Sequence, residues 1–144
     1  RRYSENGNTQ ASIKKRRYVS WVAMEKKIDR VILEMGSGAS LRSGDYNKAA
    51  CRAVEDAIHN SSLSFLKELN FNVESDMAVH VTIGVQDTNA INAEKVKAIL
   101  PHGIISIFVV KGGLNVPYPS QGYTTIIASA AIEEFVDMSG MSKV

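Results

Sequence analysis

The feature that constrains the fold most is a stripe of small and apolar residues that follows Asp45. These residues recur at spacings of three and four, which is the period of one face of an α-helix. They are Tyr46, Ala49, Ala50, Ala53, Val54, Ala57 and Ile58. Asp45 is a good N-cap, and His59-Asn60-Ser61 ends the pattern. Because so many members are alanine, the helix can approach its neighbour closely, and we expect that neighbour to be a β-sheet.

Four stretches have the composition of strands: Ile28–Met35, Met77–Val85, Ile104–Val110 and Thr124–Ile132. Apolar and less apolar residues alternate in the second stretch, which predicts a strand covered on one face. The third is apolar on nearly both faces, so we expect it to be central. The end of the fourth stays open, because "AAIEEFVDM" is also compatible with a helix.

Two further helices are expected. One is capped by Ser62 and carries Leu63, Leu66 and Leu69, and the other runs from Asn92 to Leu100 and is stopped by Pro101. The order β-α-α-β-α-β-β predicts one α+β domain over residues 28–144, with about four strands and helices on one face. The other sheet face then needs a cover. The N-terminal arm or a second copy of the chain can supply it, and we expect oligomerisation through the sheet.

Two glycine-containing segments are candidate pocket elements. We expect Gly36–Gly44 to be a loop before the helix, where backbone N–H groups attract anions. Its spacing fits neither a Walker loop nor GxGxxG, so a nucleotide site is not expected. A small carboxylate or amide site and a plain turn stay open. Lys111-Gly112-Gly113 begins a second loop, up to Tyr123, where glycines permit a ligand or a neighbouring subunit to come close.

Few single residues are candidates for a catalytic or ligand-binding role. Glu34 is a candidate general base or ligand acceptor, or it forms a structural ion pair with Arg52 or Lys48. Charges of opposite sign at Asp45, Lys48, Arg52 and Asp56 are typical of a solvated helix face. His59, His80 and His102 have no metal-site spacing, although His80 could reach a pocket. The lone Cys51 is expected near the core, and no metal or cofactor is expected.

The charge of the chain is unevenly distributed. Residues 1–30 carry nine Lys or Arg and three acids, which gives +6, and the remaining 114 residues carry eight basic and twelve acidic side chains, which gives −4. Residues 1–27 therefore form a basic arm on a mildly acidic domain. The run Lys14, Lys15, Arg16, Arg17 is expected to contact RNA phosphates or an acidic protein surface, with Trp21 as an anchor.

The arm also bears on location. Acid-poor leaders with Arg and Ser are typical of organelle import, and the chain begins without Met. We therefore expect a mitochondrial or plastid location, with the cytoplasm as the alternative. No stretch approaches the roughly 20 apolar residues of a membrane span.

Several segments together resemble a known family. "LEMGSGASLRSGDYNKAACRAVEDAIHNSSL", "VTIGVQ", "EKVKAILPHG" and "VVKGGLNVP" are similar to a conserved, functionally undescribed family of short bacterial and fungal proteins named after a Listeria hypothetical protein. The resemblance covers residues 29–132 and leaves the arm outside. It implies the fold and oligomerisation, but no reaction.

A more distant resemblance is to one repeat of the ring-opening amidohydrolases, cyanuric acid hydrolase and barbiturase. Gly36–Asp45 is similar to the first loop of such a repeat, and Lys111-Gly112-Gly113 is similar to the second. The chain departs from those enzymes at Lys111, which stands where they have the nucleophilic Ser, and its first loop lacks their Lys. The resemblance therefore implies an architecture, a homotrimer with sites between subunits, but no Ser–Lys dyad.

Two functions from different classes follow. The first is a small-molecule site between subunits, related to cyclic-amide hydrolysis, with Glu34 and Lys111 as catalytic residues. The expected ligand-binding residues are Gly36, Ser37, Gly38, Arg52, Lys97, Gly112 and Gly113, with Arg52 or Lys97 holding an anionic group. The second is a non-catalytic accessory subunit of an organellar assembly, docked by its basic arm. Whether the chain is an enzyme stays open.

Overall fold

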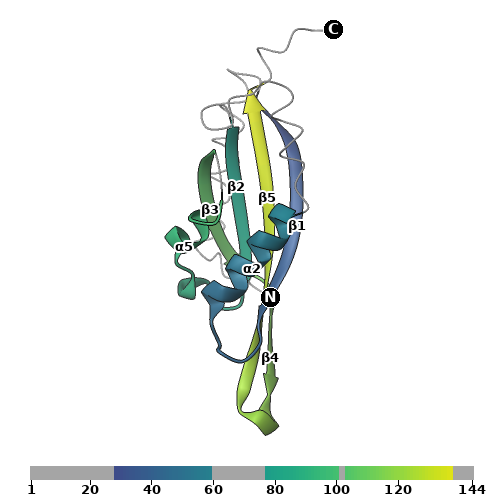
Figure 1. Ribbon diagram of the computed structural model, residues 1–144, viewed down its shortest axis with the longest axis vertical. Coiled ribbons are helices and arrows are strands. Elements are labelled where there is room, and N and C mark those ends of the chain that lie inside the picture. Colours follow the sequence, from purple (N-terminus) through teal and green to yellow (C-terminus); the bar gives the residue numbers. More distant parts are fainter. Residues whose placement is uncertain (1–27, 60–76, 101–102, 138–144) are drawn as a thin grey trace, which may run out of the picture.

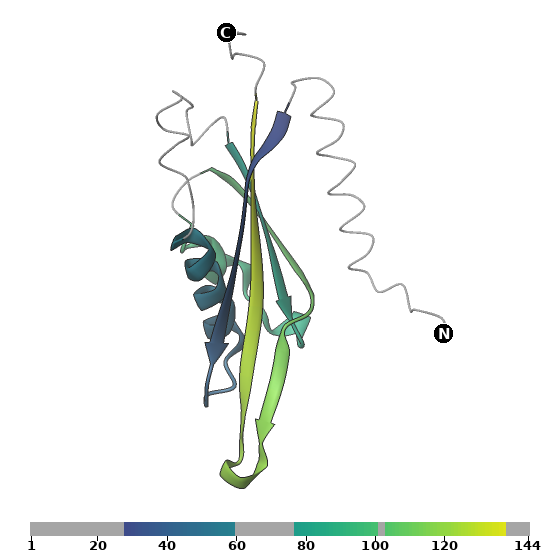
Figure 2. The same cartoon turned by 90° about the vertical axis from the view of Figure 1, so that its right-hand side faces the viewer.

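The protein forms one mixed β-sheet with helices on one side (Figures 1 and 2). The computed structural model describes residues 28–59, 77–100 and 103–137. The basic arm, the helix expected after Ser62, Pro101 and His102 lie outside the described residues. No helix in the described parts of the chain is long and apolar enough to cross a membrane.

The sheet has five strands, which are β1 (Ile28–Ser40), β2 (Met77–Val85), β3 (Ile104–Lys111), β4 (Leu114–Tyr118) and β5 (Tyr123–Asp137). Their order is β1-β5-β2-β3, and β4 also pairs with β5. The pair β2–β3 is parallel, and the pairs that involve β5 are antiparallel. The longest strand, β5, therefore lies inside the sheet and β3 at an edge, so the expectation that Ile104–Val110 is central is wrong.

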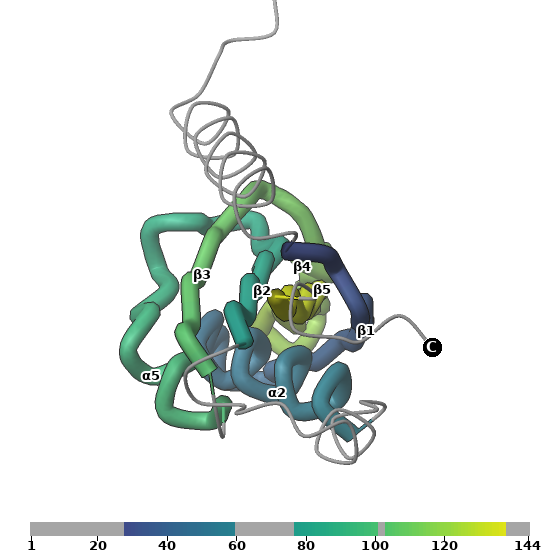
Figure 3. Tube along the Cα trace, turned by 90° about the horizontal axis from the view of Figure 1, so that it is seen from above, coloured from purple at the N-terminus to yellow at the C-terminus, as the bar shows by residue number. Residues whose placement is uncertain are grey.

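The helices lie on one face of this sheet. The long helix is α2 (Tyr46–His59), and the short helix is α5 (Ala93–Lys97) (Figure 3). The backbone N–H of Lys48 donates to Asp45 Oδ1 over 3.1 Å, which confirms Asp45 as the N-cap. Asn92 caps α5 in the same way, but that helix ends at Lys97, earlier than expected.

The register of the strands defines which residues share the helix side of the sheet. Val79, Val81, Ile83 and Val85 of β2 are buried there, as their alternation predicts. They lie beside even-numbered residues of β5, such as Ala130 and Ile132. The core is completed by the alanines of α2, all of which are fully buried.

Two expected loops are in fact strands. Gly36 to Ser40 continue β1 and pair with β5, from Gly36 opposite Ala130 to Ser40 opposite Ile126. The connection to α2 is therefore only residues 41–45. The segment after Lys111 contains β4, which forms a hairpin with the first residues of β5 and extends beyond the rest of the sheet (Figure 1). The helical alternative for "AAIEEFVDM" is also wrong up to Asp137, because β5 runs through it.

Candidate functional site

Packing against α2 explains the two glycines of β1. A Cβ atom at Gly36 would lie 2.4 Å from the carbonyl oxygen of Ala53, and one at Gly38 would lie 2.3 Å from the backbone nitrogen of Ala53. Such distances are far inside van der Waals contact, so only glycine fits under α2. The expectation of a loop at Gly36–Gly44 is therefore wrong for its first five residues, which are a strand beneath the helix.

Side chains of α2 also bind the outer edge of β1. The Asp56 carboxylate accepts a hydrogen bond from the backbone N–H of Ser37 over 3.0 Å, and Arg52 Nη1 donates to the carbonyl oxygen of Ala39 over 2.7 Å. These contacts occupy backbone groups that an edge strand would otherwise expose. Arg52 thus bonds to a backbone carbonyl, where we had expected an ion pair with Glu34 or a ligand anion.

The opposite sheet face, which we call the open face, carries a hollow of about 520 Å³. Its floor includes three hydroxyl residues from three strands, Ser37 of β1, Thr82 of β2 and Ser129 of β5. The register brings them together, since Ser129 lies opposite both Ser37 and Gly84. Apolar walls come from Met35, Val110 and Ala131. A volume of this size is typical of small-molecule sites.

The charge of the hollow is limited. Asp56 is the ionisable residue among the described residues that line it, and its carboxylate already accepts the Ser37 N–H. A lining of hydroxyls and a carboxylate offers hydrogen-bond acceptors and hydroxyl donors, but no cation for an anionic group. Arg52 and Lys97 do not line the hollow.

The Lys111-Gly112-Gly113 turn lies against Gly84, which is one of the residues that line the hollow. Gly113 has φ +62°, and a Cβ there would meet the carbonyl oxygens of Ile127 and Gly84. Gln86 Nε2 donates to the carbonyl oxygens of Gly112 and Gly113, each over 3.1 Å. The close approach expected of these glycines is therefore made to strands of the same chain.

The two expected catalytic residues are not brought together within one chain. Glu34 lies on β1 and Lys111 at the end of β3, with β5 and β2 between these edge strands. Three inter-strand spacings amount to about 14 Å. Lys111 is exposed, and Lys97 Nζ lies 3.9 Å from Glu94 Oε1. A site that joins Glu34 and Lys111 across two chains stays a prediction.

Glu34 instead has a carboxylate as its neighbour. Glu34 lies opposite Ile132, and Glu134 lies opposite Ile32, so the two acids are diagonal neighbours on the helix side of the sheet. Glu134 is only 2% exposed, and its Oε2 has no hydrogen-bond partner among the described residues. Burial, followed by the charge of Glu34, raises the pKa of Glu134 to about 7.

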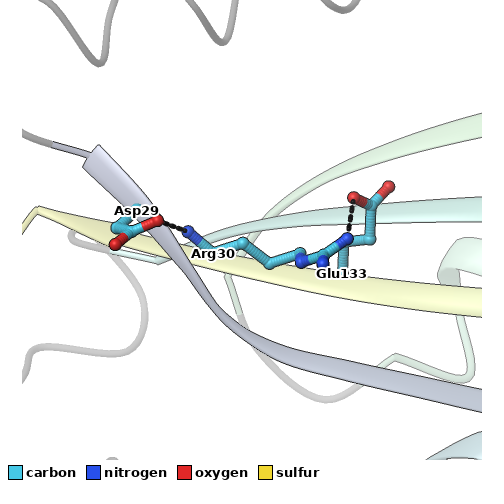
Figure 4. A network of polar contacts seen from close by, with 3 residues as sticks. All are labelled: Asp29, Arg30 and Glu133. Atoms are coloured by element: carbon cyan, nitrogen blue, oxygen red, sulfur yellow. Dashed lines mark hydrogen bonds and ion pairs between the residues drawn. The ribbon is translucent and has the colours of Figure 1, made fainter.

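The remaining candidates, His80 and Cys51, pack against other side chains of the domain. His80 lies on the open face but is 5% exposed, with its ring between Phe108 and Phe135 at 6.0 and 4.9 Å. Cys51 is partly buried beside the core, and burial raises the pKa of its thiol. Near His80, Arg30 Nη1 of β1 lies 3.4 Å from Glu133 Oε2 of β5 (Figure 4).

Sequence reasoning included Ser37 among the ligand-binding residues but missed Thr82 and Ser129. The alternation of β2 placed Thr82 on the less apolar face, which was a usable signal. Ser129 gave no such signal, because its strand end was ambiguous and the partners of that strand depend on the register.

A comparison with solved structures finds one similar protein, an FtsZ-like protein of unknown function from Nostoc punctiforme. The two share 28% sequence identity with a TM-score of 0.66, over 76% of this chain and 97% of the other. A search among curated proteins finds no match. A family model for conserved hypothetical proteins matches residues 30–134, which cover the described sheet except for the first two residues of β1 and the last three of β5. The chain therefore belongs to the Lin0512 family of conserved hypothetical proteins.

Proposed function

We propose that the protein binds a small polar molecule without negative charge in the hollow of the open face, and that the site lies between copies of the chain. The observation that carries this proposal is the convergence of Ser37, Thr82 and Ser129 in a hollow of about 520 Å³ with apolar walls. Hydroxyl groups both donate and accept hydrogen bonds, so they suit a ligand that offers both N–H and C=O groups. Neutral cyclic amides have that chemistry.

Binding without turnover fits this lining better than hydrolysis. A serine nucleophile needs a base within hydrogen-bond reach. Asp56 is the ionisable group among the described lining residues, and it is engaged by the Ser37 N–H. His80 lies opposite Glu133, which is four residues along β5 from Ser129. His80 is therefore about 13 Å from Ser129, too far to act as its base. The resemblance to ring-opening amidohydrolases thus contributes a ligand class, not a reaction.

The test is saturation-transfer NMR with uracil, hydantoin and glutarimide as neutral cyclic-amide probes. We expect at least one probe to bind the wild-type protein. Orotate, which adds a carboxylate to the uracil ring, should bind at least tenfold more weakly than uracil, because the described lining offers no cation. Absence of binding by all three neutral probes at millimolar concentration contradicts the proposal.

A matched pair of variants locates the site. Ser129 is exposed in the hollow, so Ser129→Leu fills it without entering the core and should abolish probe binding. Thr124→Leu adds a similar side chain to the same strand outside the hollow, on the opposite side of the sheet, and should leave binding unchanged. Equal binding by both variants would place the probe elsewhere and contradict the proposal.

A further inference from the structure

The exposed apolar side chains of the sheet lie on one face. Eight large hydrophobic residues are exposed in the described structure, and six of them belong to regular strand pairs that orient them toward the open face. These six are Leu33, Met35, Ile104, Leu114, Val116 and Tyr118. A concentrated apolar surface of this kind marks an interaction site.

The hairpin of β4 and the first residues of β5 carries half of these residues. Leu114, Val116 and Tyr118 lie opposite Ile127, Thr125 and Tyr123, so they share the open face with the odd-numbered residues of β5. The hairpin extends past the end of β1 and β2 (Figure 2). The rings of Tyr118 and Tyr123 pack edge to face at 5.5 Å, and the guanidinium of Arg42 lies 5.7 Å from the centre of the Tyr123 ring. The projecting hairpin is thus internally supported.

The hairpin is also bound to its own chain. On the side away from the open face, Asn115 Nδ2 donates to the Tyr46 hydroxyl at the start of α2 over 2.6 Å. Thr125, which lies opposite Val116, donates from its Oγ1 to the carbonyl oxygen of Leu41 over 2.9 Å. These contacts hold the hairpin against α2 and the segment before it. They leave the apolar side, with Leu114 60% exposed, available to another molecule.

We propose that a second copy of this chain covers the open face, and that its β4–β5 hairpin lies over the hollow and closes it. The same face carries both complementary features, a projecting apolar hairpin and a hollow with apolar walls. One copy cannot place its own hairpin there, because β4 is paired beside β5 at residues 123–127, while the hollow lies at residues 129–131. In a pair of copies, the hairpin of one chain can reach the hollow of the other.

The size of the face supports a stable contact between copies. The 15 residues of β5 span about 50 Å, and four strands are about 14 to 19 Å wide, so the face measures roughly 700 to 950 Å². A standard stable interface buries about 800 Å² on each partner. Homodimer interfaces are also the most apolar, which matches this face.

Charge argues against the arm of the same chain as the cover. Residues 1–27 carry eight basic and two acidic side chains. The described open face offers little negative charge in return, since Glu133 is already within 3.4 Å of Arg30. A cover with apolar strands, as in another copy, matches it better.

The first test is molar mass by light scattering after size-exclusion chromatography, on the full-length protein. We expect the wild type to have at least twice the mass of one chain, and Val116→Asp to have the mass of one chain with an unchanged circular dichroism spectrum. Thr124→Asp places the same charge on the opposite side of the same hairpin and should keep the wild-type mass. A monomeric wild type, or equal masses for both variants, overturns the inference.

The second test identifies the contact by disulfide trapping in a Cys51→Ala background. Val116 lies opposite Thr125, four residues along β5 from Ser129, which is about 13 Å and too far for a disulfide within one chain. A Val116→Cys/Ser129→Cys double variant should therefore form covalent dimers or larger species on oxidation. Thr124→Cys/Ser129→Cys should stay monomeric on a denaturing gel. Absence of cross-linking in the first double variant also overturns the inference.

The inference rests on the proposed function only in treating the hollow as a ligand site, and the two fail separately. If no neutral probe binds but Val116→Asp dissociates the protein and the cross-link forms, the contact stands and the ligand proposal fails. If the wild type is monomeric but Ser129→Leu abolishes probe binding, ligand binding in the hollow stands, while its placement between copies and the docked hairpin both fail.

Discussion

At the scale of single residues, Glu134 is the side chain whose chemistry the fold changes most. It is buried on the helix side of the sheet with Glu34 as a diagonal neighbour, and both effects disfavour its ionised form. A protonated carboxyl in such a position is compatible with an apolar core, whereas a carboxylate there is costly. The folded protein should therefore hold this proton up to a higher pH than the unfolded chain does.

We expect Glu134 to make stability fall between about pH 4.5 and pH 7. Its pKa rises from 4.5 to about 7 on folding, so the folded state binds more protons in this window. The free energy of unfolding then decreases as pH rises, by up to about 3 kcal/mol, and levels off above pH 7. Urea unfolding at pH 5, 6, 7 and 8 measures this slope.

The substitution Glu134→Gln removes this titration. The variant should be about as stable as the wild type at pH 5 and more stable at pH 8. Glu133→Gln is the matched control, because Glu133 is the neighbouring acid, faces the open side and lies near Arg30. That control should retain the pH slope of the wild type. A Glu134→Gln variant with an unchanged slope would contradict the assignment.

At the scale of elements, the contact between β1 and α2 determines the architecture. Gly36 and Gly38 of the strand face Ala49, Ala53 and Ala57 of the helix, which follow one another at spacings of four. Small residues on both elements bring the backbones together. The Asp56 and Arg52 side chains of α2 then bind the edge of the strand on the same side.

We expect Gly36→Ala to destabilise the protein by about 3 kcal/mol or more, because its Cβ would overlap the backbone of Ala53 and Ala57. Gly44→Ala is the control. Gly44 has φ +65° and nothing within 4 Å of an added Cβ, so it should cost only about 1 to 2 kcal/mol of backbone strain. Chemical denaturation of the three proteins at one pH compares them. Similar losses for both variants would show that helix packing is not what requires Gly36.

This contact also shows how far sequence predicts the fold. The helix period, the Asp45 cap and the strand Met77–Val85 depend on local pattern, and they were confirmed with their bounds or nearly so. Gly36 to Ser40 were mistaken for a loop because Gly and Ser are turn formers in isolation. Only the helix that lies across them makes glycine necessary in a strand, and that contact is tertiary.

The candidate site was less predictable than the fold for the same reason. Ser37, Thr82 and Ser129 are far apart in sequence and meet only through the register of β1, β5 and β2. β4 was hidden in a segment rich in Gly and Pro, since Pro117 and Pro119 suggest a loop. A peripheral hairpin strand tolerates Pro117, and all five residues of β4 are exposed.

At the scale of the whole molecule, the exposed apolar residues and the positive charge belong to different parts of the sequence. Most of the exposed large apolar residues in the described structure lie on the open face, whereas the positive charge is concentrated in residues 1–27. The remaining residues, 28–144, carry nine basic and thirteen acidic side chains, a net charge of −4. The arm is therefore the candidate for an interaction with a polyanion, which is the basis of the alternative function as an accessory subunit.

The arm can be tested without shortening the chain. We expect the full-length protein to bind a fluorescent single-stranded oligouridylate in anisotropy titrations, with an affinity that falls as KCl rises. Replacing Lys14, Lys15, Arg16 and Arg17 by Gln should weaken binding at least tenfold at low salt. It should also reduce the slope of log affinity against log salt by up to about 3. Each phosphate contact that is lost means that fewer counterions are released on binding.

The matched control replaces four lysines outside the arm, Lys48, Lys95, Lys97 and Lys111, by Gln. It removes the same charge from the whole molecule, so a non-specific effect of net charge would weaken RNA binding equally in both variants. Retained affinity in the control and loss in the arm variant would assign the contact to the run Lys14–Arg17. If neither variant changes the salt slope, these residues do not contact phosphates, and an acidic protein surface becomes the partner to test next by the same pair of variants.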